Sequence, residues 1–333
     1  MKISRQTILL TGGTGSFGKA FIKHLLSEKR FKGTIRVFSR DEFKQHELIQ
    51  KYKGDTRLRF FIGDVRDLSR LQRAIHGANI VIHAAALKQI PILEYNPFEA
   101  VKTNILGTQN VIESAIDSVA EKVLLISSDK ACSPVNLYGA TKIVAEKLFI
   151  QGNSYVGKGK TIFSVVRYGN VMGSRGSVVP LFLEQKKNNS LTVTDQRMTR
   201  FWITLEQGVK FVLDSLVRMS GEEIFVPKLP SVKVTDLARA IAPKTKIRIV
   251  GIRPGEKIHE MLISEDEARH TKEFKDHFVI EPEFPWIEKK KKVSEKSKKI
   301  KDGFSYSSGN NTVWLTTPQI KKMLHQFVNS DGH

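Results

Sequence analysis

The stretch Thr7-Ile8-Leu9-Leu10-Thr11-Gly12-Gly13-Thr14-Gly15-Ser16-Phe17-Gly18 joins an apolar run to a glycine-rich turn. Residues 7–11 have the composition of a buried strand, and residues 17–27 have the apolar spacing of a helix. Glycines at this spacing permit a tight turn, let the backbone approach a pyrophosphate and allow close packing of helix on strand. The stretch therefore predicts a dinucleotide-binding turn, whose cofactor-binding residues are Gly12, Gly15, Ser16, Phe17 and Gly18.

The same alternation of strand and helix continues through the first 170 residues. Short runs rich in branched residues predict strands at 34–39, 58–62, 80–84, 123–128 and 162–167. Between them, helical patterns lie at 41–51, 68–75, 100–119 and 138–150. Strands that alternate with helices are typical of βαβ units in a parallel sheet covered on both faces. We therefore expect an α/β fold with a Rossmann-type doubly wound sheet.

The pattern becomes less regular after Asn170, where a Gly/Ser-rich loop begins. Helices are predicted at 204–219 and 234–241, and strands at 224–226 and 246–250. We divide the chain into a nucleotide-binding domain, 1–170, and a smaller C-terminal α/β substrate-binding domain, 171–333, with 202–228 able to cross back to the first.

The composition sets limits on function. The 333 residues include 40% hydrophobic side chains, a single cysteine (Cys132) and a formal net charge of +20. No apolar run approaches the roughly 20 residues of a membrane-spanning helix, and the N-terminus has no signal-peptide pattern, so we expect a soluble, cytoplasmic protein without a membrane partner. With one cysteine and no metal-ligand spacing among His76, His259 and His270, neither a disulfide nor a metal site is expected.

The positive charge is partly concentrated in one segment. Lys289–Lys301 holds eight lysines and one glutamate. This segment is either a solvated surface loop or a site for an anionic partner. Because no aromatics are interleaved and no helix-turn-helix or RNA-binding pattern is present, we do not expect a nucleic-acid partner.

The end of the second predicted strand indicates which dinucleotide binds. Ser39, Arg40 and Lys44 offer one hydroxyl and two cations, which suit the 2′-phosphate of NADP better than a 2′-hydroxyl. Asp41 lies among them and keeps NAD open as an alternative. After the third strand, Asp64 and Val65 are placed either to meet the adenine or to form a plain surface turn.

A catalytic group is predicted after the fifth strand, where Ser127-Ser128-Asp129-Lys130 precedes Tyr138 and Lys142. Tyr138 and Lys142 lie one helical turn apart on one face. A nearby ammonium lowers the pKa of a phenol, so Tyr138 is expected to act as a base near neutral pH, with Ser128 orienting the substrate oxygen.

Together these motifs resemble the extended, nucleotide-sugar-modifying branch of the short-chain dehydrogenase/reductase superfamily. Within that branch the chain is similar to the inverting UDP-N-acetylglucosamine 4,6-dehydratases of pseudaminic acid synthesis, through residues 85–91, 128–130 and 197–202. The resemblance implies a homo-oligomer, dimeric or higher, with a hexamer included. It also implies cofactor contacts from Ala84, Ala85, Ala86, Lys88, Asn104, Ser127, Tyr138, Lys142 and Tyr168.

The resemblance also implies a mechanism, in which the pair Asp129-Lys130 distinguishes dehydration from epimerisation. Tyr138, with Lys142 and Ser128, removes the 4-hydroxyl proton while hydride passes to NADP. A neutral, partly desolvated Lys130 then removes the C5 proton, and Asp129 assists loss of water from C6. Hydride returns to C6 and C5 is reprotonated on the opposite face. Asp129 and Lys130 could instead form a salt-bridged loop.

Substrate binding is the least specific part of the prediction. A UDP diphosphate needs cations and backbone donors. The candidate residues, drawn from motifs in both halves of the chain, are Lys88, Asn170, Arg175, Val179, Pro180, Thr194, Arg197, Arg253 and Glu256. The alternatives to a UDP-sugar dehydratase are a UDP-sugar 4-epimerase and a non-catalytic NADP-sensing protein; the presence of both Tyr138 and Lys142 weighs against the second.

Overall fold

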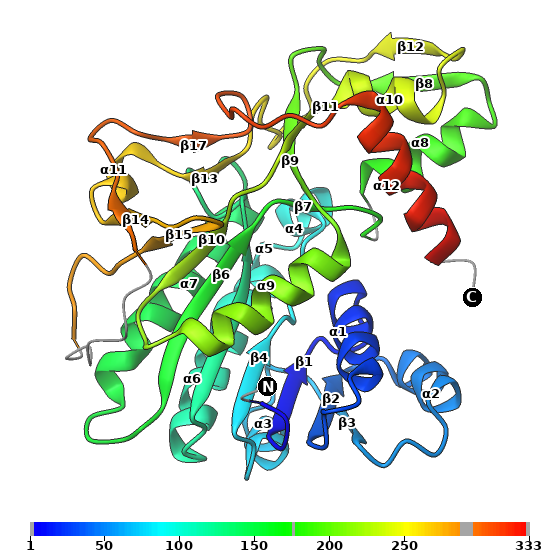
Figure 1. Ribbon diagram of the computed structural model, residues 1–333. Coiled ribbons are helices and arrows are strands. Elements are labelled where there is room, and N and C mark those ends of the chain that lie inside the picture. Colours follow the sequence, from blue (N-terminus) through cyan, green and yellow to red (C-terminus); the bar gives the residue numbers. More distant parts are fainter. Residues whose placement is uncertain (1–2, 175–176, 287–295, 331–333) are drawn as a thin grey trace.

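The computed structural model describes residues 3–174, 177–286 and 296–330. Within them a ten-stranded sheet forms the centre of the molecule (Figure 1). From one edge to the other its strands are β16 (Lys298–Lys299), β14 (Thr271–Glu273), β15 (His277–Ile280), β10 (Ile224–Pro227), β6 (Ile162–Tyr168), β5 (Lys122–Ser128), β4 (Ile80–His83), β1 (Thr7–Thr11), β2 (Thr34–Ser39) and β3 (Leu58–Ile62). The strands from β3 to β10 are parallel, and β15, β14 and β16 extend the sheet in antiparallel fashion. The expected doubly wound sheet is confirmed.

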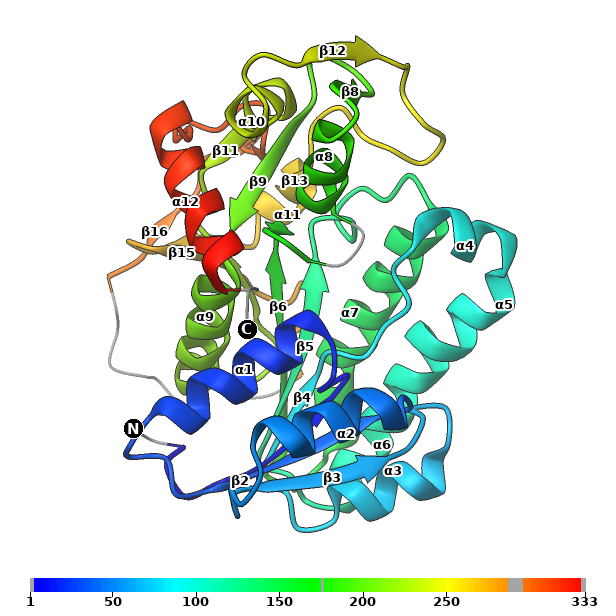
Figure 2. The ribbon, with the colours of Figure 1, turned by 90° about the vertical axis from the view of Figure 1, so that its right-hand side faces the viewer.

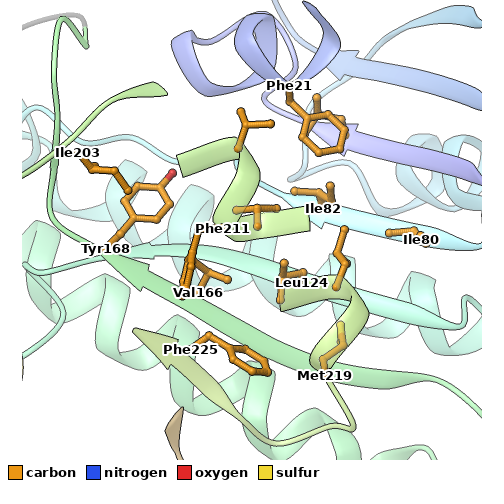
Figure 3. Packing of buried hydrophobic residues seen from close by; sticks show 14 of the residues in the cluster. Phe21, Ile80, Ile82, Leu124, Val166, Tyr168, Ile203, Phe211, Met219 and Phe225 are labelled. Carbon is orange, nitrogen blue, oxygen red and sulfur yellow. The ribbon is translucent and has the colours of Figure 1, made fainter. Parts of the chain in front are cut away.

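Alternate residues of the central strands bury into different helical layers, which explains their continuous apolar runs. Ile8 and Leu10 of β1 pack with Phe21 and Val212, whereas Leu9 faces the opposite cluster. Figure 3 shows part of the first cluster. The helices on that face are α1 (Ser16–Ser27), α2 (Glu42–Lys51) and α9 (Leu205–Arg218), and those on the other face are α3 (Leu68–Ile75), α6 (Gly107–Asp117) and α7 (Leu137–Tyr155).

The connection between β4 and α6 differs from the single helix expected at 100–119. It contains α4 (Ile90–Tyr95), α5 (Pro97–Ala100) and a π-helical turn, η1 (Val101–Leu106), before α6 begins at Gly107. Pro91 and Pro97 each stand in the first turn of a helix, where a missing N–H is tolerated.

A smaller unit lies above the carboxyl ends of the parallel strands (Figure 2). It has its own apolar core, which includes Phe182, Trp202, Leu237 and Leu324. Its elements are the sheet β11 (Ser231–Lys233), β9 (Thr199–Ile203) and β7 (Asn170–Val171), the pair β8 (Ser190–Val193) with β12 (Lys246–Ile249), and the helices α8 (Val178–Lys186), α10 (Val234–Ile241) and α12 (Thr317–Ser330). The pair β13 (Met261–Ile263) with β17 (Tyr306–Ser307) packs instead with the core of the large sheet, and the short helix α11 (Glu265–Ala268) follows β13.

The second half of the chain does not stay within this unit. Helix α9 packs on α1, and β10 pairs with β6, so residues 205–227 belong to the large sheet and its covering layer. Strands β15, β14 and β16 also join the large sheet, whereas 202–228 was the one segment named from the sequence as able to cross back. Lys298 and Lys299 of the lysine-rich segment therefore lie at the sheet edge, while residues 289–295 are outside the described part.

Candidate active site

The glycine turn lies where the order of parallel strands reverses, between β1 and β4. Gly12 has φ +68, and a Cβ there would stand 2.9 Å from the backbone of Ala84 and Ala85. Only glycine meets both demands without strain. A Cβ on Gly18 would lie 2.3 Å from the carbonyl oxygen of Gly13, so α1 packs directly on the turn. Gly15 precedes the first residue of α1 with no side-chain cap, so the helix N-terminus faces the cavity with free N–H groups.

A buried hydrogen-bond chain fixes the segment after β4. The hydroxyl of Thr11 accepts the backbone N–H of Ala84 and of Ala85, both at 3.2 Å, and therefore donates to Nδ1 of His83 at 2.7 Å. The other ring nitrogen of His83 is 3.1 Å from Thr108 Oγ1. Burial lowers the pKa of His83 to about 3, so the ring is neutral, and its two nitrogens hydrogen-bond to Thr11 and Thr108.

Asn104 has a related structural role. Its side-chain amide binds the N–H and the carbonyl of Leu87, each at 2.9 Å, and donates to Thr141 Oγ1 at 3.0 Å. The side chain is buried and does not line either cavity described below. The sequence predicted a cofactor contact, whereas the structure places Asn104 behind the 84–88 segment, which it holds in place.

A cavity of about 340 Å³ lies over the ends of β1, β2 and β3. It is lined by the predicted group Gly12, Gly15, Ser39, Arg40, Asp41, Lys44, Asp64, Val65, Ala84, Ala85 and Ala86. Asp41 caps α2 by accepting the N–H of Lys44 and pairs with its ammonium. Arg40 stands 3.6 Å from Asp64 at the cavity wall.

A second cavity, about 540 Å³, shares the glycine turn and continues toward the smaller unit. The predicted catalytic residues Ser128, Asp129, Lys130, Tyr138 and Lys142 all line it. So do Ser16, Phe17, Gly18, Lys88, Ser127, Tyr168, Asn170, Arg253 and Glu256. The structure thus brings these residues from six segments of the chain to one place.

The start of α7 determines where Tyr138 lies. Asn136 caps the helix by accepting the N–H of Gly139 at 2.8 Å and donates to the carbonyl of Gly255 at 2.8 Å. A Cβ on Gly139 would stand 2.4 Å from the carbonyl oxygen of Lys130. The absence of a side chain at Gly139 therefore lets the first turn of α7 pack on 128–130, where Tyr138 meets Ser128.

The protonation of the Tyr–Lys pair differs from the expectation. Burial raises the pKa of Tyr138, and the cation that opposes this effect is Lys130. Lys142 instead donates to the carbonyl of Ile126 at 2.8 Å, and burial lowers its pKa to about 8. Lys130 thus has the pKa-lowering effect on Tyr138 that was expected of Lys142.

Lys130 also differs from the expected neutral amine. Its Nζ lies 2.9 Å from Asp129 Oδ1 and 2.9 Å from Glu260 Oε1. Burial alone lowers the pKa of Lys130, but the two carboxylates outweigh it and hold the pKa above its ordinary value. Burial raises the pKa of Asp129, whose Oδ2 is buried without a partner among the described residues. Asp129 is therefore easier to protonate than an ordinary aspartate, while Lys130 carries its proton as an ammonium.

Several predicted substrate residues lie away from the cavities. Val179 is fully buried in the core of the smaller unit, next to Pro180 in α8. Thr194 bonds Met198 Sδ, and Arg197 is exposed and paired with Asp195 at 2.8 Å. None of these four lines either cavity, and Arg175 lies outside the described residues. Asn170 does line the larger cavity, where its Oδ1 is buried with no partner in the described chain.

Two charged residues of the site were missed. Glu260, just before β13, and Arg200, on β9, stand 3.6 Å apart behind Lys130. Glu260 follows the motif Arg253–Lys257 by three residues, which is the single signal that pointed to this segment.

The sheet order, the glycine turn and the Ser128–Tyr138–Lys142 cluster define a Rossmann-type protein of the short-chain dehydrogenase/reductase class. Within that class, the chain belongs to the polysaccharide biosynthesis protein family, whose model matches residues 8–282.

Individual relatives cover nearly the whole chain. It is 50% identical over 329 residues to the inverting UDP-N-acetylglucosamine 4,6-dehydratase of Campylobacter jejuni, covering 97% of this chain and 98% of the relative. It is 40% identical to a UDP-glucose 4-epimerase of Rickettsia rickettsii, covering 96% and 95%. Among solved structures, Pen from Bacillus thuringiensis matches with a TM-score of 0.88 and 37% identity, covering 98% of this chain and 99% of that one. No described helix is long and apolar enough to span a membrane.

Proposed function

We propose that the protein is an NADP-dependent UDP-N-acetylglucosamine 4,6-dehydratase that inverts C5. The observation that carries this proposal is the pair Asp129-Lys130 in one cavity with Ser128, Tyr138 and Lys142, because dehydration needs an acid and a base beyond the groups for hydride transfer. The similarity to the Campylobacter jejuni dehydratase supports it.

The residues around the smaller cavity fit a nicotinamide dinucleotide. The uncapped N-terminus of α1 and the close approach of Gly12 to Ala84 form a cradle for a pyrophosphate. Arg40 and Lys44 line the same cavity, which favours a 2′-phosphate. When bound, the dinucleotide supplies a reversible hydride acceptor.

The catalytic side chains divide the proton transfers. Tyr138 takes the proton of the 4-hydroxyl in its phenolate form, which the neighbouring Lys130 ammonium favours against the effect of burial. Asp129, whose pKa burial raises, is the acid for the leaving 6-hydroxyl. Lys130 must first lose a proton before it can take one from C5. Two carboxylate oxygens lie 2.9 Å from its Nζ, Asp129 Oδ1 and Glu260 Oε1, and of these two residues Asp129 lines the cavity, so it is the proposed acceptor. Transfer of one proton from Lys130 to Asp129 therefore makes Lys130 the base for C5 and Asp129 the acid for the 6-hydroxyl.

The remaining cavity residues bind the sugar nucleotide. Arg253 and the loop beginning at Asn170 provide a cation and polar donors for the diphosphate, and Lys88 stands between the cofactor and sugar ends. Asn170 Oδ1, which has no hydrogen-bond partner among the described residues, accepts a hydrogen bond from the substrate. We further propose a UDP-2-acetamido-2,6-dideoxy-L-arabino-4-hexulose product, the first step of pseudaminic acid synthesis, in a cytoplasmic homo-oligomer.

Incubation with UDP-N-acetylglucosamine in D₂O, followed by NMR, tests the proposal. We expect a new C6 methyl signal, deuterium at C5 and the inverted C5 configuration. A C4 epimer that keeps its 6-hydroxyl would instead support the 4-epimerase suggested by the Rickettsia rickettsii relative. An unchanged sugar, with NADP or NAD bound, would rule out both.

A further inference from the structure

Glu260 lies directly behind the proposed catalytic pair. Its Oε1 is 2.9 Å from Lys130 Nζ, and its side chain is 2% exposed. Lys130 and Asp129 line the larger cavity, whereas Glu260 does not. Glu260 therefore contacts Lys130 from the side that faces away from the cavity.

The backbone of Glu260 is held from two directions. Its N–H donates to Ser308 Oγ at 2.9 Å, and its carbonyl accepts the N–H of Ser308 at 2.7 Å. Ser308 Oγ lies 2.7 Å from Thr199 Oγ1, and Thr199 also bonds Nδ1 of His259 at 2.8 Å. These contacts join the strand β9, the segment before β13 and the residues after β17. The carboxylate of Glu260 thus stands at a fixed position relative to Lys130.

Charges around Lys130 come from several elements. Asp129 and Glu260 attract its ammonium, while Arg200 and Lys257 disfavour it, and Tyr138 faces it from α7. Arg200 Nε lies 3.6 Å from Glu260 Oε1. The charges on Asp129, Lys130, Glu260 and Arg200 sum to zero, and the ammonium of Lys257 acts on the first three as well.

We propose that Glu260 is a positioning residue: its carboxylate holds Lys130 against Asp129 and sets the exchange of one proton between them. This inference rests on the proposed dehydratase function. In the exchange, an Nζ–H bond of Lys130 breaks and an Oδ1–H bond of Asp129 forms. Elimination then returns both groups to their first state, because Lys130 takes the C5 proton and Asp129 gives its proton to the departing hydroxyl.

Substitutions that remove a negative or a positive charge from this cluster have opposite expected effects. Glu260→Gln removes a negative charge, so both Lys130 and Asp129 hold protons less strongly, and both limbs of the pH–rate profile move to lower pH. Arg200→Gln removes a positive charge, and both limbs move to higher pH. From the effect of a charge at this range, we expect shifts of about 1–3 pH units.

The measurement is C5 deuterium incorporation and kcat for UDP-N-acetylglucosamine as functions of pH. Glu260→Asp, which keeps the charge, restores the positions of the limbs, and Glu273→Gln, on an exposed carboxylate of β14 paired with Lys228, moves nothing. A purely structural role for Glu260 lowers kcat without moving the limbs, and that result overturns the proposal. Should Glu260→Gln fail to fold, the direction of the Arg200→Gln shift decides.

A second readout separates this inference from the proposed function. In protein labelled with ¹³Cε-lysine and assigned through Lys130→Arg, NMR follows the Lys130 titration without any substrate. We expect Lys130 to titrate above an ordinary lysine and to move down in Glu260→Gln. If the unmodified protein converts no UDP-sugar but this shift is seen, the dehydratase function is wrong and the Glu260–Lys130 coupling stands. If Lys130 titrates identically in both proteins, the coupling is wrong.

Discussion

At the scale of the residue, the ammonium of Lys142 sits where burial disfavours charge. Its pKa is lowered from 10.5 to about 8 in the folded protein. Between these values the unfolded chain binds more protons than the folded one, so stability rises with pH across the window. Below pH 8 the buried ammonium destabilises the fold by about 3 kcal/mol relative to an unshifted lysine.

Lys142→Met tests this effect. Between pH 7.5 and 9.5, we expect the unfolding free energy of the unmodified protein to rise by about 2 kcal/mol more than that of Lys142→Met. Urea unfolding at each pH provides the measurement. Lys147→Met, at an exposed position of the same helix α7, should show no such pH-dependent difference. A constant difference for Lys142→Met would contradict the lowered pKa.

A second prediction at this scale concerns cofactor choice. Arg40 and Lys44 line the smaller cavity, and Arg40 is more than half exposed there, so it can reach a phosphate without rearranging the fold. Combined Arg40→Ser and Lys44→Ser should weaken NADP binding by tenfold or more, because charge-assisted hydrogen bonds contribute about 1.5–3 kcal/mol each. Calorimetric titration with NADP and NAD measures both affinities. Equal losses for the two dinucleotides would show that these cations do not read the 2′-phosphate.

At the scale of the element, Gly139 and Gly208 form a matched pair of glycines inside helices α7 and α9. A Cβ on Gly139 meets the Lys130 carbonyl oxygen at 2.4 Å, whereas one on Gly208 meets nothing closer than 4.0 Å. Alanine is a better helix former than glycine by about 1 kcal/mol. Gly208→Ala should therefore raise stability slightly, and Gly139→Ala should lower both stability and activity.

Gly139→Ala should reduce activity more than stability. Moving the first turn of α7 away from Lys130 separates Tyr138 from Ser128, and a misplacement of about 1 Å can lower a rate by about a hundredfold. Steady-state kinetics and thermal unfolding of both variants measure this. Full activity in Gly139→Ala would show that the close approach of α7 is not needed to place Tyr138.

Elements with strong local periodicity were predictable. The helix Val234–Ile241 and the strands Thr7–Thr11, Thr34–Ser39 and Leu58–Ile62 have the bounds expected from the sequence. The π-helical turn at Val101–Leu106 was not, because it interrupts a stretch that reads as one helix. Strand β15 was missed because its stability depends on pairing with β10, whose partner residues are at least fifty positions away, and β14 was missed because it in turn pairs with β15.

In the site, too, residues that are close in sequence were predicted, and a residue brought in by the fold was not. Asp129 and Lys130 adjoin each other at the end of a strand, and Tyr138 and Lys142 share one helix face, so local spacing indicated them. Glu260 was beyond such reasoning, because only the tertiary fold brings it to Lys130. The protonation of Lys130 was therefore misjudged, since its second carboxylate comes from the other half of the chain.

At the scale of the whole molecule, one buried arginine joins the two halves. Arg167 on β6 pairs with Glu146 of α7 and, at 2.8 Å, with Glu267 of α11. Its side chain is 1% exposed, and it also donates to the carbonyl of Leu262 at 2.9 Å. The central sheet, its helical layer and the segment that carries Glu260 are thus connected through one guanidinium.

Removing one partner from this buried group should destabilise the entire protein. Burial alone raises the pKa of Glu267, but Arg167 outweighs it and holds the pKa at about 2. Because this value lies below that of the unfolded chain, the stabilisation is present at neutral pH and is lost as pH falls from about 4.5 toward 2. Arg167→Met leaves the buried carboxylate of Glu146 and the partly buried one of Glu267 without their cation, and it should lower the unfolding free energy at pH 7 by about 3–5 kcal/mol. Glu267→Gln should flatten the acid dependence, while Glu273→Gln, outside this network, should leave it unchanged. Urea unfolding from pH 3 to pH 7 compares the three variants. An acid dependence that survives in Glu267→Gln would mean that other carboxylates, rather than this connection between the halves, determine where the fold fails in acid.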